Sequence, residues 1–362
     1  MAKHGIRGAS VANILTGNDF AGWSLCIGAG ASLPLFPTWQ DLVQELLTSG
    51  PNALSSADAD YLRQSFPPEA LIRASQELLG ADDGAYRSYL TQILYANIQK
   101  QAERLWPTVA KCLMARVPGN ALASEWKDFR NFIRLHTTTS SDLAAVILDG
   151  LGSDHAPNCI LTFNAEPLLF AALNAEAVKR FRLYNPMPTD SDSENGPGVI
   201  DRVEGSTSWS KRGRIPFYFC HGFLPINHPP VTAGTTPAAT FDSKMVFSES
   251  DYLNLANNVL SWQSSVFTRA AMSDRILFVG LSLTDPNMRR WLAWIHGQRL
   301  KEIKARNPTV RESTQHIWLQ RTSGNPAIER WTEALVAHLG IRIVWIDNWS
   351  EAGPTLRQML NL

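Results

Sequence analysis

The 362-residue sequence has no excess of charge of either sign, because 33 Lys and Arg residues balance 33 Asp and Glu residues. A protein that coats nucleic acid or binds acidic lipid needs a surplus of basic residues, so the composition argues against both as general functions. The chain also has no apolar run of the roughly 18 residues that a membrane-spanning helix requires. Its first five residues lack the apolar stretch of a secretory signal. We therefore expect a soluble, cytoplasmic protein that binds neither nucleic acid directly nor a membrane.

Cysteine is scarce in this sequence, and the few cysteines are dispersed. The four residues are Cys26, Cys112, Cys159 and Cys220, and none forms a Cys-x-x-Cys pair with another. A zinc site built from such pairs is therefore excluded, and the eight histidines include no His-Glu-x-x-His spacing of a zinc-binding helix. We predict no metal site, and we expect Cys26, Cys159 and Cys220, which lie in apolar runs, to be small core residues.

The apolar residues occur in short runs that alternate with helical patterns. A chain of 362 residues can bury a sizeable core and indicates two domains or one domain with a large insertion. The runs that resemble buried parallel strands are 24–27, 158–162, 215–220, 275–279, 341–346 and, as a sixth candidate, 316–319. Helical patterns lie between the later runs, at 166–177, 248–258, 286–300 and 327–339. This alternation predicts an α/β fold with an open parallel sheet flanked by helices on both faces.

The stretch from about residue 42 to residue 151 breaks this alternation. It contains consecutive amphipathic patterns, several of them separated by proline and glycine, at 41–48, 57–65, 69–79, 84–99, 103–115, 124–136 and 141–150. We predict a large all-helical insertion after the first strand, within a single domain that spans residues 1–362. Two polar stretches, 185–214 and 228–243, are expected to be long loops. The basic cluster at 211–214 is expected to form a solvated turn, with contact to an acidic partner as the alternative.

The first motif that can carry chemistry is Gly28-Ala29-Gly30-Ala31-Ser32, directly after a predicted strand. Glycines at such a turn let the backbone approach a pyrophosphate, whose oxygens the backbone N–H groups can then contact. The motif is not the Gly-x-Gly-x-x-Gly of dinucleotide dehydrogenases, because Leu33 occupies the third glycine position. A tight turn without a ligand explains it equally well.

The second motif, Thr162-Phe163-Asn164-Ala165-Glu166, ends another predicted strand. Ligands of open α/β sheets bind outside the carboxyl ends of the strands. Asn164 could there bond a ribose hydroxyl or hold a water in line with a sugar carbon. Alternatively, Asn164 or Glu166 caps the following helix.

The third motif is His221-Gly222, just past the predicted strand at 215–220. A histidine is basic near physiological pH and can accept a proton from a sugar hydroxyl or from water. A structural histidine satisfied by its neighbours is the alternative.

The fourth motif, Gly280-Leu281-Ser282-Leu283-Thr284-Asp285, follows a strand and precedes Pro286. Asp285 before a proline at the first helical position is typical of a helix cap, whereas Ser282 could bond a ribose or a phosphate. Because the four motifs end four predicted strands, we expect them to converge on one crevice.

This ordered set resembles the sirtuin family, in the zinc-free branch found in bacterial anti-phage systems. The motifs that carry the resemblance are Gly-Ala-Gly-Ala-Ser at 28–32, Pro37-Thr38-Trp39, Thr-Phe-Asn-Ala-Glu at 162–166, His221-Gly222-Phe223, Ser-Glu-Ser-Asp-Tyr at 248–252 and Gly-Leu-Ser-Leu-Thr-Asp at 280–285. They span most of the chain but leave the helical insertion and the C-terminal segment uncovered.

The resemblance implies a Rossmann-like fold that binds NAD+ as its substrate, without zinc. It assigns His221 as the general base, and Asn164 to the nicotinamide ribose or to an attacking water. The residues that it places around NAD+ are Gly28, Ala29, Gly30, Ala31, Ser32, Trp39, Thr162, Glu166, Gly280, Ser282 and Asp285.

The sequence departs from the family at three places. The four zinc-binding cysteines of deacetylating sirtuins are missing, since only Cys220 lies between Asn164 and His221. The Phe-Arg pair that follows the first loop in the family is replaced by a segment containing Trp39. Glu166 stands where the family has Asp, so a longer carboxylate has to be placed near the nicotinamide.

Without the zinc module, water is the simplest acceptor of the ribosyl group. The resemblance therefore implies an NAD+ glycohydrolase that forms nicotinamide and ADP-ribose and depletes NAD+ in abortive infection, in the bacterial cytoplasm. An NAD-dependent protein deacylase is one alternative, and a catalytically weak scaffold that senses NAD or ADP-ribose is the other.

Such a hydrolase has to be regulated, and the sequence shows no second recognisable sensor domain. This suggests control by assembly, either as a homo-oligomer or with a separately encoded partner. By analogy with relatives, that partner would be a hexameric ATPase/translocase or an Argonaute-like protein.

Overall fold

The computed structural model describes residues 5–16, 22–50, 52–151, 155–182, 199–205, 210–226, 246–257, 261–310 and 314–362. The predicted loop at 228–243 and most of the one at 185–214 therefore lie outside the described residues.

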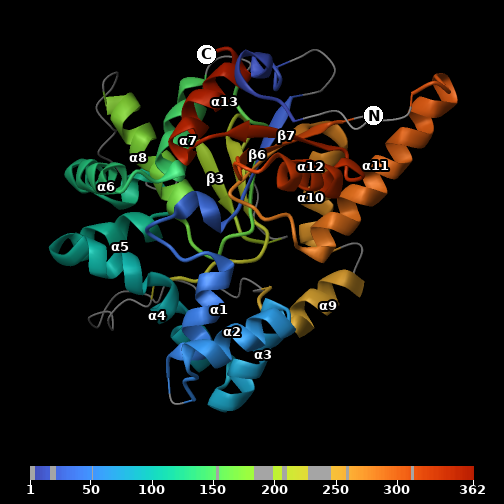
Figure 1. Ribbon diagram of the computed structural model, residues 1–362. Helices are drawn as coiled ribbons and strands as arrows, with labels where there is room; N and C mark the ends of the chain where they lie inside the picture. Colours follow the sequence, from blue (N-terminus) through green and yellow to red (C-terminus); the bar gives the residue numbers. More distant parts are fainter. Residues whose placement is uncertain are drawn as a thin grey trace.

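The described residues form a seven-stranded parallel sheet (Figure 1). Its strands are β1 (Trp23–Ile27), β2 (Ile160–Thr162), β3 (Ile200–Val203), β4 (Ile215–Phe219), β5 (Arg275–Val279), β6 (His316–Arg321) and β7 (Ile341–Ile346). Their order across the sheet is β3-β4-β2-β1-β5-β6-β7. The open parallel α/β sheet predicted from the sequence is confirmed, including the candidate strand that became β6.

The sheet is buried because helices cover both of its faces. Leu25 and Ile27 of β1 point into one hydrophobic core, whereas Cys26 points into the other. The first face is covered by α7 (Thr139–Asp149), α8 (Leu168–Arg182) and α13 (Ala352–Leu360), and the second by α10 (Trp262–Ser273), α11 (Pro286–Arg306) and α12 (Pro326–Ala337) (Figure 1).

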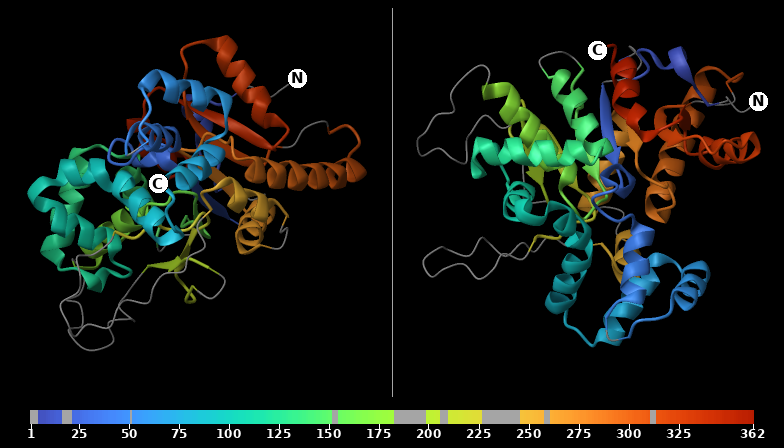
Figure 2. Two further views of the ribbon diagram at one scale, coloured as in Figure 1. Left: turned by 90° about the horizontal axis from the view of Figure 1, so that it is seen from below. Right: turned by 60° about the vertical axis from the view of Figure 1, so that its left-hand side comes forward.

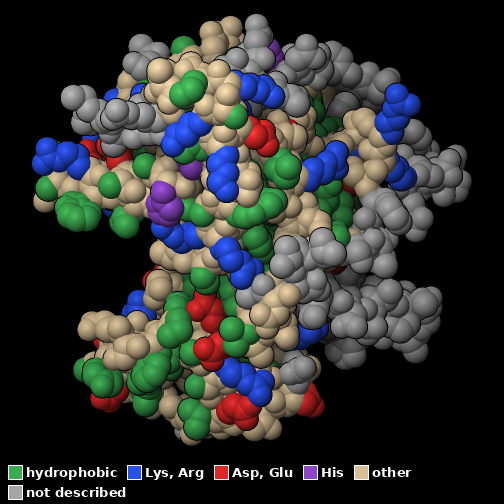
Figure 3. All heavy atoms as spheres, turned by 90° about the vertical axis from the view of Figure 1, so that its right-hand side faces the viewer, with side chains coloured by type: hydrophobic (Ala, Val, Ile, Leu, Met, Phe, Trp, Pro, Cys, Tyr) green, Lys and Arg blue, Asp and Glu red, His purple; other side chains and the backbone are tan. Residues whose placement is uncertain are grey.

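The predicted helical insertion is present between β1 and β2. Its helices are α1 (Trp39–Thr48), α2 (Ser56–Ser65), α3 (Pro68–Leu79), α4 (Asp83–Ala102), α5 (Trp106–Met114), α6 (Ala123–Leu135) and α7. The helices α6 and α7 return to the sheet and pack against α8, whereas α1–α4 form a lobe beyond its edge (Figures 1 and 2). Figure 3 shows that the surface is indented between the upper part of the molecule and the lobe below it.

Among the strands and α-helices of the described residues, three were not predicted from the sequence. The strand β3 lies inside the predicted loop 185–214 and pairs with β4, which overturns that part of the loop prediction. Its four residues, Ile-Asp-Arg-Val, are too few to show a periodic pattern, and pairing with β4 stabilises them. The helices α10 and α13 were not predicted, because their patterns are short and interrupted by polar residues.

No helix among the described residues is long and apolar enough to cross a membrane. The four cysteines are free and buried, as expected for Cys26, Cys159 and Cys220. Within the described ranges, no group of three or more His, Cys, Asp or Glu side chains is arranged to hold a metal ion.

Candidate functional site

The four sequence motifs lie at the carboxyl edge of the sheet. Gly28 follows β1, Asn164 follows β2, His221 lies just beyond β4, and Gly280 follows β5. The strand β1 lies between β2 and β5. The strands β2–β4 follow β1 on one side of it, and β5–β7 are then added on the other side. Open α/β sheets bind ligands where the strand order reverses in this way. The structure therefore brings the four motifs to one edge.

The loops that follow β1 and β5 pack directly against each other. A Cβ on Gly28 would lie 2.6 Å from the oxygen of Gly280, and a Cβ on Gly280, whose φ is +67°, would lie 2.4 Å from the nitrogen of Ala31. The N–H of Gly28 donates to Val279 O at 2.9 Å, and that of Gly30 donates to Gly280 O at 3.0 Å. The glycines are thus required for contact between two loops. Two N–H groups that were expected to face a pyrophosphate are instead bonded within the protein.

Glu166 links the loop after β1 to the loop after β2. Its Oε1 accepts hydrogen bonds from the Ser32 hydroxyl at 2.6 Å and from Asn164 Nδ2 at 2.8 Å. Its Oε2 accepts a bond from the N–H of Leu168, the first residue of α8, at 2.5 Å. Burial raises the pKa of Glu166, whereas these three bonds act to lower it. One buried carboxylate therefore caps α8 and fixes both Ser32 and Asn164.

Asn164 is held with its amide nitrogen bonded and its amide oxygen available. Its backbone N–H donates to Thr162 Oγ1 at 3.1 Å, and Nδ2 is bonded to Glu166. No described residue donates a hydrogen bond to Asn164 Oδ1. This oxygen can accept a bond from a ribose hydroxyl or from water, and the capping role that the sequence left open belongs to Glu166.

His221 is a buried histidine with one unpartnered ring nitrogen. The hydroxyl of Tyr252 lies 3.4 Å from Nδ1, and the edge of its ring packs against Phe163 with the ring centroids 4.7 Å apart. Nε2 lies 3.5 Å from Asp285 Oδ2 and makes no hydrogen bond with any described residue. Burial lowers the pKa of His221, and the Asp285 carboxylate offsets this only in part. The imidazole is therefore neutral near pH 7 and can accept a proton.

Asp285 contributes to both the helix and the site. Its Oδ1 caps α11 by accepting bonds from the N–H groups of Asn287 at 2.8 Å and Met288 at 3.0 Å. Its Oδ2 faces His221. The two alternatives considered for this residue, a cap and a site residue, are thus compatible.

The remaining predicted residues lie farther out. The hydroxyl of Ser282 is exposed and pairs with that of Thr284 at 2.7 Å. Leu283 between them is buried with a left-handed backbone, φ 53°, which leaves both hydroxyls on the surface. Trp39 begins α1 and packs against Phe247, with the ring centroids 5.1 Å apart.

Two residues without a role predicted from the sequence, Tyr252 and Glu69, also contribute to the site. Tyr252 lies on α9 (Glu249–Asn257), and its ring centroid lies 5.3 Å from that of His221. Burial first, and then the carboxylates of Asp285 and Glu69, raises the pKa of Tyr252, so the phenol keeps its proton. Glu69 belongs to α3, which packs against α9. The sequence contained the 248–252 motif but no signal for Glu69, which comes from the insertion.

Comparison with known families identifies the chain. A model of the SIR2-like domain matches residues 158–343, just over half of the chain, which includes β2, β4, β5 and the loops that follow them. A search of curated proteins found no match. The matched segment carries Asn164, His221 and Asp285, whereas the glycine loop precedes it. The chain therefore belongs to the SIR2-like domain family.

Proposed function

We propose that this protein is an NAD+ glycohydrolase that cleaves NAD+ to nicotinamide and ADP-ribose. The SIR2-like family uses NAD+, which supplies the substrate. The observation that carries the proposal is that Asn164 and His221 directly follow the neighbouring strands β2 and β4. Asn164 offers an unbonded amide oxygen, and the neutral His221 offers a buried nitrogen without a partner. Both groups suit a sugar hydroxyl or a water.

The reaction needs little from the protein beyond positioning and proton transfer. The bond between ribose C1 and the nicotinamide nitrogen breaks, and nicotinamide leaves as a neutral pyridine with the bonding pair. Water forms the new C1–O bond to the oxocarbenium-like sugar. In the proposed mechanism Asn164 Oδ1 orients the ribose or the water, and His221 takes the proton. Glu166 holds Asn164 in place through the bond to Nδ2.

Water is the acceptor favoured by this chain. An acetyl-lysine acceptor requires a peptide groove beside a zinc module, and all four cysteines of this chain are buried in the core. In a cell, uncontrolled hydrolysis would deplete NAD+, as an abortive-infection effector against phage would do when triggered. We expect self-association or a separately encoded partner to control it.

The geometry around α9 suggests where such control acts. Asn164 and His221 are each only 6% exposed, and Tyr252 lies against His221. The helix α9, which carries Tyr252, packs on α3 of the helical insertion, so a movement of α9 would uncover His221. An assembly that contacts the insertion could therefore open the site. Sizing the purified protein with and without the product of a neighbouring gene tests this part.

The reaction itself is tested by product analysis with purified protein. NAD+ is incubated with the protein, with and without an acetylated peptide, and nicotinamide, ADP-ribose and the peptide are quantified. We expect equimolar nicotinamide and ADP-ribose without peptide. Nicotinamide release that requires the peptide and matches its deacetylation would establish a deacylase. Thermal stabilisation by NAD+ with no products would establish a sensing scaffold.

A further inference from the structure

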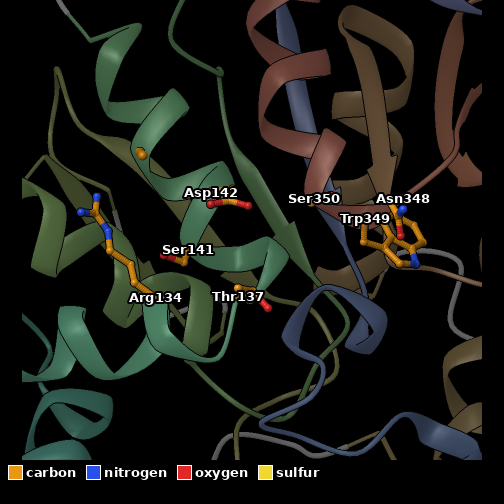
Figure 4. Close-up of a pocket in the computed structure, with 8 residues that line it drawn as sticks. Arg134, Thr137, Ser141, Asp142, Asn348, Trp349 and Ser350 are labelled. Carbon is orange, nitrogen blue, oxygen red and sulfur yellow. The ribbon is translucent and has the colours of Figure 1, made fainter.

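A second polar cavity lies away from the carboxyl edge of the sheet. It has a volume of about 510 Å³, within the range of small-molecule sites, and opens between the start of α7 and the turn that precedes α13 (Figure 4). Its lining residues are Arg134, Thr137, Ser141, Asp142, Ala145, Asn348, Trp349 and Ser350. None of them belongs to the proposed NAD+ site.

Asp142 gives this cavity a carboxylate with unoccupied hydrogen-bond acceptors. It is half-buried, and no described residue donates a hydrogen bond to it. Burial raises the pKa of Asp142, with Arg134 opposing this. The guanidinium of Arg134 is itself 2.8 Å from Glu176, and it points away from Asp142 in Figure 4. The cavity therefore offers a ligand the Asp142 carboxylate, whereas the Arg134 guanidinium on its wall is engaged by Glu176.

The other walls supply a flat surface and further hydrogen-bonding groups. Trp349 is partly buried against the core, which fixes its ring. The side chains of Thr137, Ser141 and Asn348 make no hydrogen bonds with the described residues. Gly353 allows α13 to approach Asp142, because a Cβ there would lie 3.0 Å from the Asp142 Cβ. The cavity thus combines one carboxylate, one aromatic ring and several free hydroxyl and amide groups.

We propose that this cavity binds a guanine-type nucleoside. The ring N–H and the exocyclic amino group of guanine are two parallel donors, which match the two oxygens of the Asp142 carboxylate. The flat base suits contact with the Trp349 ring, and the sugar hydroxyls can bond the free groups of Thr137, Ser141 and Asn348. A nucleoside also suits the cavity volume.

The helix α7, which lines one side of the cavity, also contacts the glycine loop. Ser140, the neighbour of the lining residue Ser141, donates a hydrogen bond from its hydroxyl to Ala31 O at 2.9 Å. The helix α7 packs on this loop. A nucleoside in the cavity therefore lies one helix away from the proposed NAD+ site.

Calorimetric titration of the purified protein with guanosine, inosine and adenosine tests the proposal without NAD+ present. Inosine lacks only the 2-amino group of guanosine. We expect guanosine to bind at least tenfold more tightly than inosine, equivalent to about 1.4 kcal/mol, and adenosine to bind more weakly than guanosine. Asp142→Asn should remove this preference.

Asp128→Asn is the matched control, because Asp128 is an exposed carboxylate on the neighbouring helix α6. It should bind guanosine as the wild type does. Trp349→Leu is a second test of the same cavity and should weaken guanosine and inosine alike. The proposal is overturned if the wild type binds no guanosine, if it binds inosine equally well, or if Asp142→Asn keeps the preference. None of these results depends on NAD+ hydrolysis.

Discussion

Replacement of Glu166 should separate its structural role from its role in placing Asn164. Glu166→Gln keeps the shape of the side chain, so the glutamine oxygen can retain the bonds from Ser32 and Asn164. Its amino group then faces the N–H of Leu168, which leaves the start of α8 without its acceptor. A lost cap and an unsatisfied buried N–H together cost several kcal/mol at most, and relief of the buried charge offsets part of this. We expect a loss of about 2 kcal/mol in the free energy of unfolding.

Urea denaturation measures this loss as a lower midpoint with an unchanged slope. Asp82→Asn is a matched control, because Asp82 also accepts a backbone N–H that begins a helix, from Ala85 at 2.8 Å, but at the surface. Water can replace that bond, so its cost should stay below about 1 kcal/mol. Glu166→Ala should lose nicotinamide release as well, because Asn164 is no longer held. This account of the Glu166 bonds would be refuted if Glu166→Gln were as stable as the wild type and Glu166→Ala were fully active.

Three further predictions concern the histidines and their neighbours. Asp285→Asn keeps the cap of α11 but removes the charge that raises the pKa of His221. The acidic limb of the profile of kcat/KM against pH should therefore move to lower pH, and an unmoved limb would contradict the pairing of Asp285 with His221. Tyr252→Phe keeps the ring contact but removes the oxygen that can accept a bond from His221 Nδ1–H, the tautomer that leaves Nε2 basic. The value of kcat/KM for nicotinamide release should fall about fivefold, equivalent to about 1 kcal/mol, and an unchanged or raised value would contradict this role. Burial lowers the pKa of His316 to about 3, so the unfolded chain binds a proton that the folded chain does not. The free energy of unfolding therefore has its full value above pH 6.5 and should fall by about 2 kcal/mol on acidification to about pH 5. Urea denaturation of His316→Asn at the same two pH values should show a smaller fall.

The fold was largely predictable because its signals are local. Each central strand is a short apolar run that ends at a glycine or a polar residue, and parallel pairing follows from the helices between them. Thr38 and Asp41 illustrate how local the signals for helices are, since the two form the capping box that starts α1. The strand β3 shows the limit, because four residues at the edge acquire their structure from pairing with β4.

The candidate site was predictable only in part, because its contacts join distant segments. The sequence placed Asn164 and His221 at strand ends, and both lie there. It could not show that Glu166 reaches Ser32, 134 residues away, because that bond depends on the close approach of two loops. Nor could it place Tyr252 against His221, since α9 is positioned by its packing against the insertion.

The central claim is that Asn164 and His221 together cleave NAD+. The most direct measurement compares nicotinamide release by the wild type, Asn164→Ala and His221→Ala, at equal concentrations of folded protein and under conditions in which the wild type turns over. Loss of a general base typically slows a reaction by about 10² to 10⁴. We predict a loss of at least about a hundredfold for His221→Ala, with Asn164→Ala similarly impaired. Undiminished release in both variants would contradict the account.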